Sequence, residues 1–281
     1  METWRVSSLT AETPTSSAVE AIAAAFVAAR KAGRALPDFP GAIPQGLDSA
    51  YACQEAAIGL WDDAIAGWKV GRVGPEFVSR VRAVRLAGPI FSRAVWRTSG
   101  VEPVSVPVFK GGFAAVEAEF VFHLLEDAPP NKTAWTVREV EALPYTMHIG
   151  IEMAGSPLAT INALGPTVVA SDFGNNAGLV LGPAVPDWRD FALEALACET
   201  FVAGESVGRG SAASLPDGPL ASAAFLLGHV AGRGRPLKAG QLISTGAMTG
   251  VHDIAEDQDG RATFGRCGEL NVRTVRADPQ K

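Results

Sequence analysis

Hydrophobic and polar positions follow two different periods along the chain, and the change falls near residue 88. Before it, apolar residues recur every three to four positions, as on one face of a helix. This pattern predicts one helix that Ser16 or Ser17 caps and that ends by Gly33, a second with Asp48 as its N-cap, and a third that begins at Pro75. We therefore expect residues 1–87 to form a mostly helical N-terminal portion.

From residue 88 onward, short β-branched and aromatic runs are separated by glycine, proline, asparagine and aspartate, as in strands joined by turns. Helical patterns interrupt these runs at 137–143 and 220–230. No repeat and no flexible linker separates the helical pattern from the strand pattern. We therefore expect one compact unit of class α+β, with 88–281 as its strand-rich catalytic portion. The expected strands are 88–91, 104–109, 116–124, 146–153, 178–182, 191–207, 241–244 and 262–275.

Composition narrows the function classes. The 281 residues are 47% hydrophobic and 19% charged, which excludes a disordered chain. The net charge is −6 and no basic run is interleaved with aromatic residues, so no nucleic-acid partner is expected. Three widely spaced cysteines argue against disulfides or a zinc–thiolate site and favour a cytoplasmic location. No signal peptide and no membrane span is expected either.

The most informative stretch carries two glutamates in an apolar strand pattern. Glu117 and Glu119 are two positions apart, so a strand places both on one face, with Ala118, Phe120 and Phe122 on the other. If that face is buried, the two carboxylates need a cation, and oxygen ligands favour Mg²⁺, Mn²⁺ or Ca²⁺. The alternative is a half-exposed strand with two solvated glutamates.

A third acid strengthens the metal hypothesis. Glu152 is the one acid in the apolar run 147–153, where it would complete a three-carboxylate site. An edge strand with Glu152 in solvent is the alternative. His148, in the same run, is a further possible ligand, although a lone histidine there is more often a satisfied core residue.

Lys69 is the candidate for proton transfer. It lies between apolar neighbours and glycines at Gly67 and Gly71, a setting that can desolvate a lysine and lower its pKa toward neutrality. The alternative is a lysine whose amine reaches water along its own stem.

Two rival motifs are present. Ser206 lies in a GxSxG pattern, and Asp217 and His229 follow in the chain order of a serine hydrolase triad. The glycines and prolines after Ser206 predict a turn rather than the helix such a motif requires. Residues 208–213 match GxGxxA, but neither the helix nor the ribose-binding acid of a dinucleotide site follows.

Five short motifs together resemble the fumarylacetoacetate hydrolase superfamily, in its 2-keto-4-pentenoate hydratase and 4-oxalocrotonate decarboxylase branch. The resemblance covers residues 40–275. Its motifs, in order, are residues 50–54 (AYACQ), 67–71 (GWKVG), 117–119 (EAE), 151–152 (IE), and 237–240 (LKAG) with 244–246 (STG).

This resemblance implies a mixed β-sheet or β-roll of the fumarylacetoacetate-hydrolase type with a helical N-terminal portion. It implies Mg²⁺ or Mn²⁺ held by Glu117, Glu119 and Glu152, with Lys69 as the catalytic residue beside them. The substrates implied are 2-oxo acids or their enols from the degradation of aromatic compounds, which the metal activates as a Lewis acid that stabilises an enolate. A homo-oligomer is also expected.

The resemblance also implies that the turn with Thr245, Gly246 and Thr249 offers backbone N–H and hydroxyl donors to the substrate carboxylate. Arg72, or Arg93 as a second choice, is a candidate for a second substrate carboxylate.

The leading reaction is hydration of a 2-hydroxy-2,4-dienoate. Decarboxylation of a 2-oxo-3-enedioate, or hydrolytic C–C cleavage of a diketo acid, are alternatives on the same site. A serine hydrolase built on Ser206 and a non-catalytic scaffold subunit are more distant ones. Two departures from the branch concern proton transfer and specificity: residues 86–91 (LAGPIF) lack an acid, and residues 154–157 (AGSP) replace a DSR motif.

Overall fold

The computed structural model describes residues 15–100 and 102–279. The expectation that the chain begins without a signal peptide falls largely on residues 1–14, which lie outside the described residues. The α-helices are α1 (Ser16–Lys31), α2 (Leu47–Leu60), α3 (Pro75–Val81), α4 (Val137–Glu141), α5 (Ile161–Leu164), α6 (Pro166–Ser171) and α7 (Gly218–Gly232).

The strands form two sheets. The larger has the order β2-β1-β10-β5-β6-β7-β3, with β11 paired to β5, and the smaller has the order β4-β13-β12-β8-β9. The strands are β1 (Ile65–Arg72), β2 (Arg85–Phe91), β3 (Val95–Arg97), β4 (Val104–Val108), β5 (Phe113–Leu124), β6 (Tyr145–Ser156), β7 (Asn176–Ala184), β8 (Ala197–Val202), β9 (Glu205–Ser211), β10 (Leu242–Ser244), β11 (His252–Asp253), β12 (Asp259–Thr263) and β13 (Glu269–Arg276).

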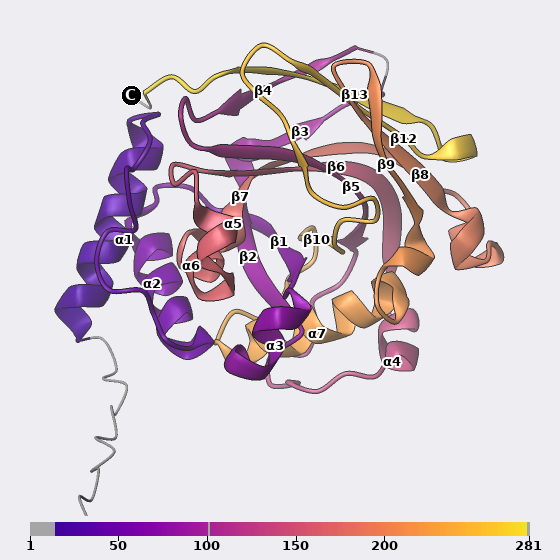
Figure 1. Ribbon diagram of the computed structural model, residues 1–281. Helices are drawn as coiled ribbons and strands as arrows, with labels where there is room; N and C mark the ends of the chain where they lie inside the picture. The colour runs from indigo at the N-terminus through magenta and orange to yellow at the C-terminus, as the bar shows by residue number, and fades with distance from the viewer. Residues whose placement is uncertain (1–14, 101, 280–281) are drawn as a thin grey trace, which may run out of the picture.

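Two long antiparallel strands organise the molecule. β5 and β6 pair without interruption over twelve residues each and bend together through the centre of the fold. Helices α1 and α2 lie on one side of this curved sheet, and α3, α4 and α7 lie at one end of it (Figure 1). The burial of β5 is nearly continuous along the strand, so both of its faces are covered.

Local sequence explains most of the helix boundaries. Thr15, rather than Ser16 or Ser17, caps α1 by accepting a hydrogen bond from the Ala18 amide. α2 begins one residue before Asp48, which lies in its first turn. α3 begins at Pro75, as predicted, because a first-turn proline loses no helical hydrogen bond.

The first third of the chain also contains a strand that the helical pattern did not predict. β1 follows α2 and pairs in parallel with β10 and antiparallel with β2. The predicted boundary between residues 87 and 88 falls inside β2, so the helical and strand-rich portions share one sheet. The expected long strand at 191–207 is instead a hairpin of β8 and β9, turned by Ala203 and Gly204 at positive φ.

The core lies mainly between the large sheet and the elements that cover it. Its largest fully buried side chains include Trp68 on β1, Phe120 and Phe122 on β5, and Ile149 and Ile151 on β6. No helix in the described part of the chain is long and apolar enough to cross a membrane.

Candidate metal centre

Glu117, Glu119 and Glu152 meet on one face of two adjacent strands. Glu117 and Glu119 alternate with the core residues Ala118 and Phe120 along β5, as the sequence predicted, and Glu152 lies on β6 directly opposite Glu117. One carboxylate oxygen from each lies within 4.8 Å of the other two. Their exposed fractions are 5%, 0% and 0%, so the solvated alternatives for these glutamates are wrong.

Burial and mutual repulsion make this cluster unfavourable as three free anions. Burial, reinforced by the charge of Glu152, raises the pKa of Glu117 to about 8, and the charge of Lys69 opposes the shift. Burial, with the charges of Glu152 and Glu117, also holds the pKa of Glu119 well above its usual value. One lysine therefore does not compensate the cluster, and a further positive charge would.

The donor set fits a divalent cation. Among the described residues, Oε1 of Glu119 and Oε2 of Glu152 are buried without a hydrogen-bond partner. A buried carboxylate oxygen without a hydrogen-bond partner is energetically costly. Both of these oxygens belong to the three glutamates whose carboxylates converge. An all-oxygen set of this kind suits Mg²⁺ or Mn²⁺.

The remaining carboxylate oxygens are held in place by neighbouring groups. Oε2 of Glu119 accepts hydrogen bonds from the Ser244 hydroxyl at 2.5 Å and from the Gly246 amide at 2.9 Å. Oε1 of Glu152 accepts one from Nδ2 of Asn176 at 3.0 Å. These hydrogen bonds fix the orientation of both carboxylates and leave the unpaired oxygens free to bind an ion. Hydrogen bonds to metal-binding carboxylates commonly have this role.

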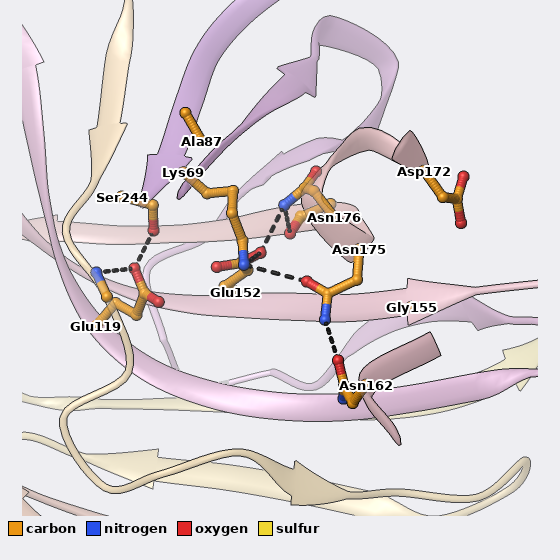
Figure 2. Close-up of polar contacts among 12 residues, drawn as sticks. Lys69, Ala87, Glu119, Glu152, Gly155, Asn162, Asp172, Asn175, Asn176 and Ser244 are labelled. Carbon is orange, nitrogen blue, oxygen red and sulfur yellow. Dashed lines mark hydrogen bonds and ion pairs between the residues drawn. The ribbon is translucent and has the colours of Figure 1, made fainter. Parts of the chain in front are cut away.

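Lys69 joins the cluster from β1. Its side chain is 4% exposed, and its Nζ lies 3.2 Å from Oε1 of Glu152 and 3.1 Å from Oδ1 of Asn175 (Figure 2). The lysine is therefore fully enclosed rather than extended to solvent. Since Lys69 donates to Asn175, the amide oxygen of Asn175 must face the lysine and its Nδ2 must face Asn162, to which it donates at 3.1 Å.

The expected direction of the Lys69 pKa shift is wrong. Burial alone lowers the pKa of this lysine, but the charges of Glu152, Glu117 and Glu119 outweigh burial and raise the pKa above its ordinary value. The sequence showed the apolar neighbours of Lys69 but not the three acids that β5 and β6 bring to it.

A cavity of about 890 Å³ opens from the cluster. Lys69, Glu117, Asn162 and Asn175 are among the polar residues that line it. Apolar residues form much of the rest of the wall, including Phe77, Val78, Leu86, Val169, Leu215, Met248 and Val251. Its size suits a small organic ligand held beside the carboxylates.

All four predicted substrate-binding residues line this cavity. Three of them are already engaged within the protein. The Thr245 hydroxyl donates to the Phe120 carbonyl, and the Gly246 amide donates to Glu119. The Thr249 hydroxyl lies 2.8 Å from that of Thr200. Arg72 is exposed at the end of β1. Contact between these four residues and a substrate stays a prediction.

Other candidates lie away from the centre. Arg93 is exposed beside Asp62 and Asp63, at 3.7 and 3.9 Å. His148 is engaged by the Gly182 carbonyl and the Thr146 hydroxyl, both at 3.0 Å, and is not in the carboxylate cluster.

The serine hydrolase motif does not form its required turn. Ser206 lies within β9 of the β8–β9 hairpin, where its hydroxyl donates to Glu199. His229 lies within α7, packed between the rings of Tyr51 and Phe225. A strand-to-helix elbow at Ser206 is therefore excluded, and so is the dinucleotide loop at 208–213, because most of that segment belongs to the same strand.

Several residues of the centre were missed from the sequence. Asn175 and Asn176 contact Lys69 and Glu152, and Ser244 anchors Glu119. Ser244 lies in the 244–246 motif but was not predicted to contact a glutamate. The only sequence signal of the two asparagines is that they are adjacent amides directly after a glycine and before an apolar run. That pattern is typical of an ordinary turn.

A search of protein-family models finds no match for the chain. Solved structures do resemble it. The structure of 4-oxalocrotonate decarboxylase from Pseudomonas putida G7, complexed with magnesium and adipate, aligns over 94% of this chain and 100% of its own, with a TM-score of 0.76 and 20% identity. The chain has the fumarylacetoacetate-hydrolase-type fold. The fold class expected from the sequence motifs is confirmed.

More distant structures share part of this fold. Fumarylpyruvate hydrolase from Pseudomonas aeruginosa, in complex with Mn²⁺ and pyruvate, covers 77% of this chain and 93% of its own, at 17% identity and a TM-score of 0.55. A 5-carboxymethyl-2-hydroxymuconate delta-isomerase from Mycobacterium smegmatis covers 76% and 79%, at 18% identity and a TM-score of 0.51. The fold thus occurs in proteins named for different reactions, and the site must decide the chemistry.

Proposed function

We propose that the chain is a divalent-metal-dependent lyase acting on a 2-oxo acid or its enol. The observation that carries this proposal is the convergence of three buried carboxylates beside a buried lysine, next to a cavity that Lys69 and Glu117 line. The similar structures are consistent with it, since one holds magnesium with adipate and another holds Mn²⁺ with pyruvate, both small oxygen-rich acids.

Glu117, Glu119 and Glu152 would hold Mg²⁺ or Mn²⁺. When bound, the ion supplies Lewis-acid stabilisation of the negative charge that develops on the 2-oxo oxygen of the substrate. Ser244, Gly246 and Asn176 orient the ligand carboxylates before the ion arrives, which limits the reorganisation that binding requires.

Lys69 is the group we assign to proton transfer. Its ammonium has three protons, and Glu152 and Asn175 accept two of them, so one is left for the cavity that Lys69 lines. A substrate carbon or a water beside the amine would be within reach of proton transfer.

Hydration of a 2-hydroxy-2,4-dienoate is the reaction we propose first. It requires a proton donor for one end of the conjugated system and a base for the attacking water. Lys69, which the neighbouring acids keep as an ammonium and which lines the cavity, is assigned the donor role. The cytoplasmic location and the homo-oligomer expected from the sequence remain part of this proposal.

Decarboxylation of a 2-oxo-3-enedioate is the second candidate. The observation that favours it is that Arg72 and Arg85 line the same cavity as Lys69, because a second substrate carboxylate would pair with a guanidinium. Decarboxylation needs no base to activate a water. The other acids that line the cavity, Glu76 and Asp217, are exposed rather than buried, which is consistent with a reaction that uses no such base.

One experiment tests the proposal and separates the two reactions. The Mg²⁺-loaded protein is incubated with fresh 2-hydroxypenta-2,4-dienoate and, separately, with 2-oxohex-3-enedioate. Ultraviolet loss of the dienol without CO₂ release is the result expected for hydration. Release of CO₂ from the diacid with the monoacid untouched would establish decarboxylation instead. Metal binding without turnover of either acid would favour the scaffold alternative.

A further inference from the structure

The two asparagines of the metal centre come from an unusual turn. Phe173, Gly174 and Asn175, between α6 and β7, all have positive φ, at 54°, 64° and 56°. Side chains rarely adopt this conformation, and a run of such residues persists only where the surrounding structure fixes it. The turn directs two consecutive amides into the site, Asn175 toward Lys69 and Asn176 toward Glu152 (Figure 2).

Arg30, at the end of α1, fixes both ends of this turn. Its side chain is 5% exposed and forms a two-pronged ion pair with Asp172, Nε to Oδ1 at 2.6 Å and Nη2 to Oδ2 at 2.9 Å. Nη1 donates to the Asn176 carbonyl at 3.0 Å, and Nη2 also donates to the Gly155 carbonyl on β6 at 2.9 Å. One guanidinium therefore joins α1, the turn and the strand that carries Glu152.

Other groups complete the clamp around Asp172 and Phe173. The Ser156 hydroxyl donates to Oδ2 of Asp172 at 2.6 Å. The Arg30 guanidinium lies 5.1 Å from the centre of the Phe173 ring. On the other side, the turn packs against Gly88, where a Cβ would lie only 2.0 Å from the Phe173 carbonyl oxygen. The turn thus has little freedom to relax if Arg30 is present.

We propose that Arg30 is a positioning residue of the metal centre, acting through Asp172 and the Asn176 carbonyl on the amides that hold Glu152 and Lys69. This inference rests on the proposed metal-dependent function. A lysine at position 30 would keep the charge but lose the planar fork that binds a carboxylate and two carbonyls at once. The effect of Arg30 on the metal centre is therefore a matter of geometry as well as charge.

Calorimetric titration with Mn²⁺ tests the proposal on the full chain. We expect Arg30→Met to weaken Mn²⁺ binding about 10-fold or more, the range seen when groups that orient metal ligands are lost. Arg30→Lys should restore part of that affinity. Asp172→Asn removes the ion pair while keeping the shape, so it should also weaken binding, and it provides a second variant if Arg30→Met does not fold.

Arg233→Met is the matched control. Arg233 is another largely buried arginine, which pairs with Glu55 between α7 and α2 and donates to Gln54. Its loss should lower the melting temperature while Mn²⁺ affinity stays within about twofold of the parent. Equal weakening of Mn²⁺ binding in Arg30→Met and Arg233→Met would show a general effect of destabilisation and overturn the inference.

The remaining outcomes are also distinct. Unchanged Mn²⁺ affinity in folded Arg30→Met and Asp172→Asn would overturn the positioning role and leave the metal centre intact. Failure of the parent protein to bind Mn²⁺ would instead overturn the proposed function itself.

Discussion

Glu117 and Glu152 are cross-strand neighbours: each is the other's direct partner in the register of β5 and β6. Like charges directly opposite each other destabilise a sheet, and here both are buried. A fold keeps such a pair only if something else offsets the cost. Lys69 offsets part of it through its ion pair with Glu152, and the proposed cation would offset the rest.

The first prediction concerns Glu117→Gln. Removing one of the opposed charges should raise the melting temperature of chelator-treated protein by a few degrees, because about 1 kcal/mol is worth about 2–4 °C in a domain of this size. The same change should weaken Mn²⁺ binding at least about 100-fold. Calorimetric titration and thermal unfolding measure the two effects. Glu205→Gln, on the exposed hairpin strand β9, should change neither quantity.

The second prediction concerns Lys69→Met. Loss of the proton-transfer group should lower kcat by about 10²–10⁴-fold. Mn²⁺ affinity should hold or rise, since a buried positive charge 3.2 Å from Glu152 has been removed. Steady-state kinetics and calorimetry on the same preparation separate the two effects. Lys110→Met, at an exposed position, is the control. A Lys69→Met protein with full kcat would rule out the catalytic assignment.

The third prediction concerns metal removal. EDTA should abolish lyase activity and lower the melting temperature by about 5–10 °C relative to protein with Mn²⁺ at about 100 times its Kd, a stabilisation of about 2.7 kcal/mol. Readdition of Mn²⁺ should restore both properties. Ser206→Ala should leave both unchanged, since Ser206 lies in a hairpin strand with its hydroxyl on Glu199. Activity that persists in EDTA and is lost in Ser206→Ala would contradict the metal-dependent assignment.

The fourth prediction is a pH dependence of stability at His229. Burial lowers the pKa of this histidine from 6.5 to about 4, with Arg233 acting in the same direction and Glu55 against it. Between those pH values the unfolded chain binds more protons at this group than the folded chain does. Its contribution to stability is therefore complete above pH 6.5 and is lost as the pH falls toward 4.

His229→Phe should remove this contribution, which is about 3 kcal/mol across the whole interval. Urea unfolding at pH 7.5, 5.5 and 4.5 measures it. The difference in unfolding free energy between the variant and the parent should change in favour of the variant as the pH falls. A difference that is the same at all three pH values would show that His229 does not titrate as described. His252→Phe, at a partly exposed histidine outside α7, is the control.

The convergence of Glu117, Glu119 and Glu152 was predictable because strand periodicity and a short apolar run indicate which face a side chain occupies. The two-residue period of a strand places Glu117 and Glu119 on one face, and Glu152 is recognisable as the one acid in an apolar run. β1 was harder to predict, because Trp68, Lys69 and Val70 form a short run between two glycines that carries no helix or strand period of its own. Its pairing with β10, about 175 residues later, gives it strand structure.

The contacts that orient the site depend on tertiary structure. Arg30 lies in the last turn of α1, where the helix dipole favours a basic residue. Its place in the sequence therefore predicts only an ordinary helix C-terminus. Its partner Asp172 is 142 residues away in the chain. Neither local propensity nor spacing connects the two, so this pair could not be predicted from the sequence.

Tyr51 and Gln54 lie on α2, yet both bind the backbone of β2 at Ala87. The Tyr51 hydroxyl accepts from the Ala87 amide, and Nε2 of Gln54 donates to the Ala87 carbonyl and to the Ala170 carbonyl. β2 is the terminal strand of the large sheet, the place where a strand from another molecule would otherwise add. Two helix side chains thus occupy the donor and the acceptor that an incoming strand would need at Ala87, and they protect this edge of the sheet against intermolecular β-pairing and aggregation.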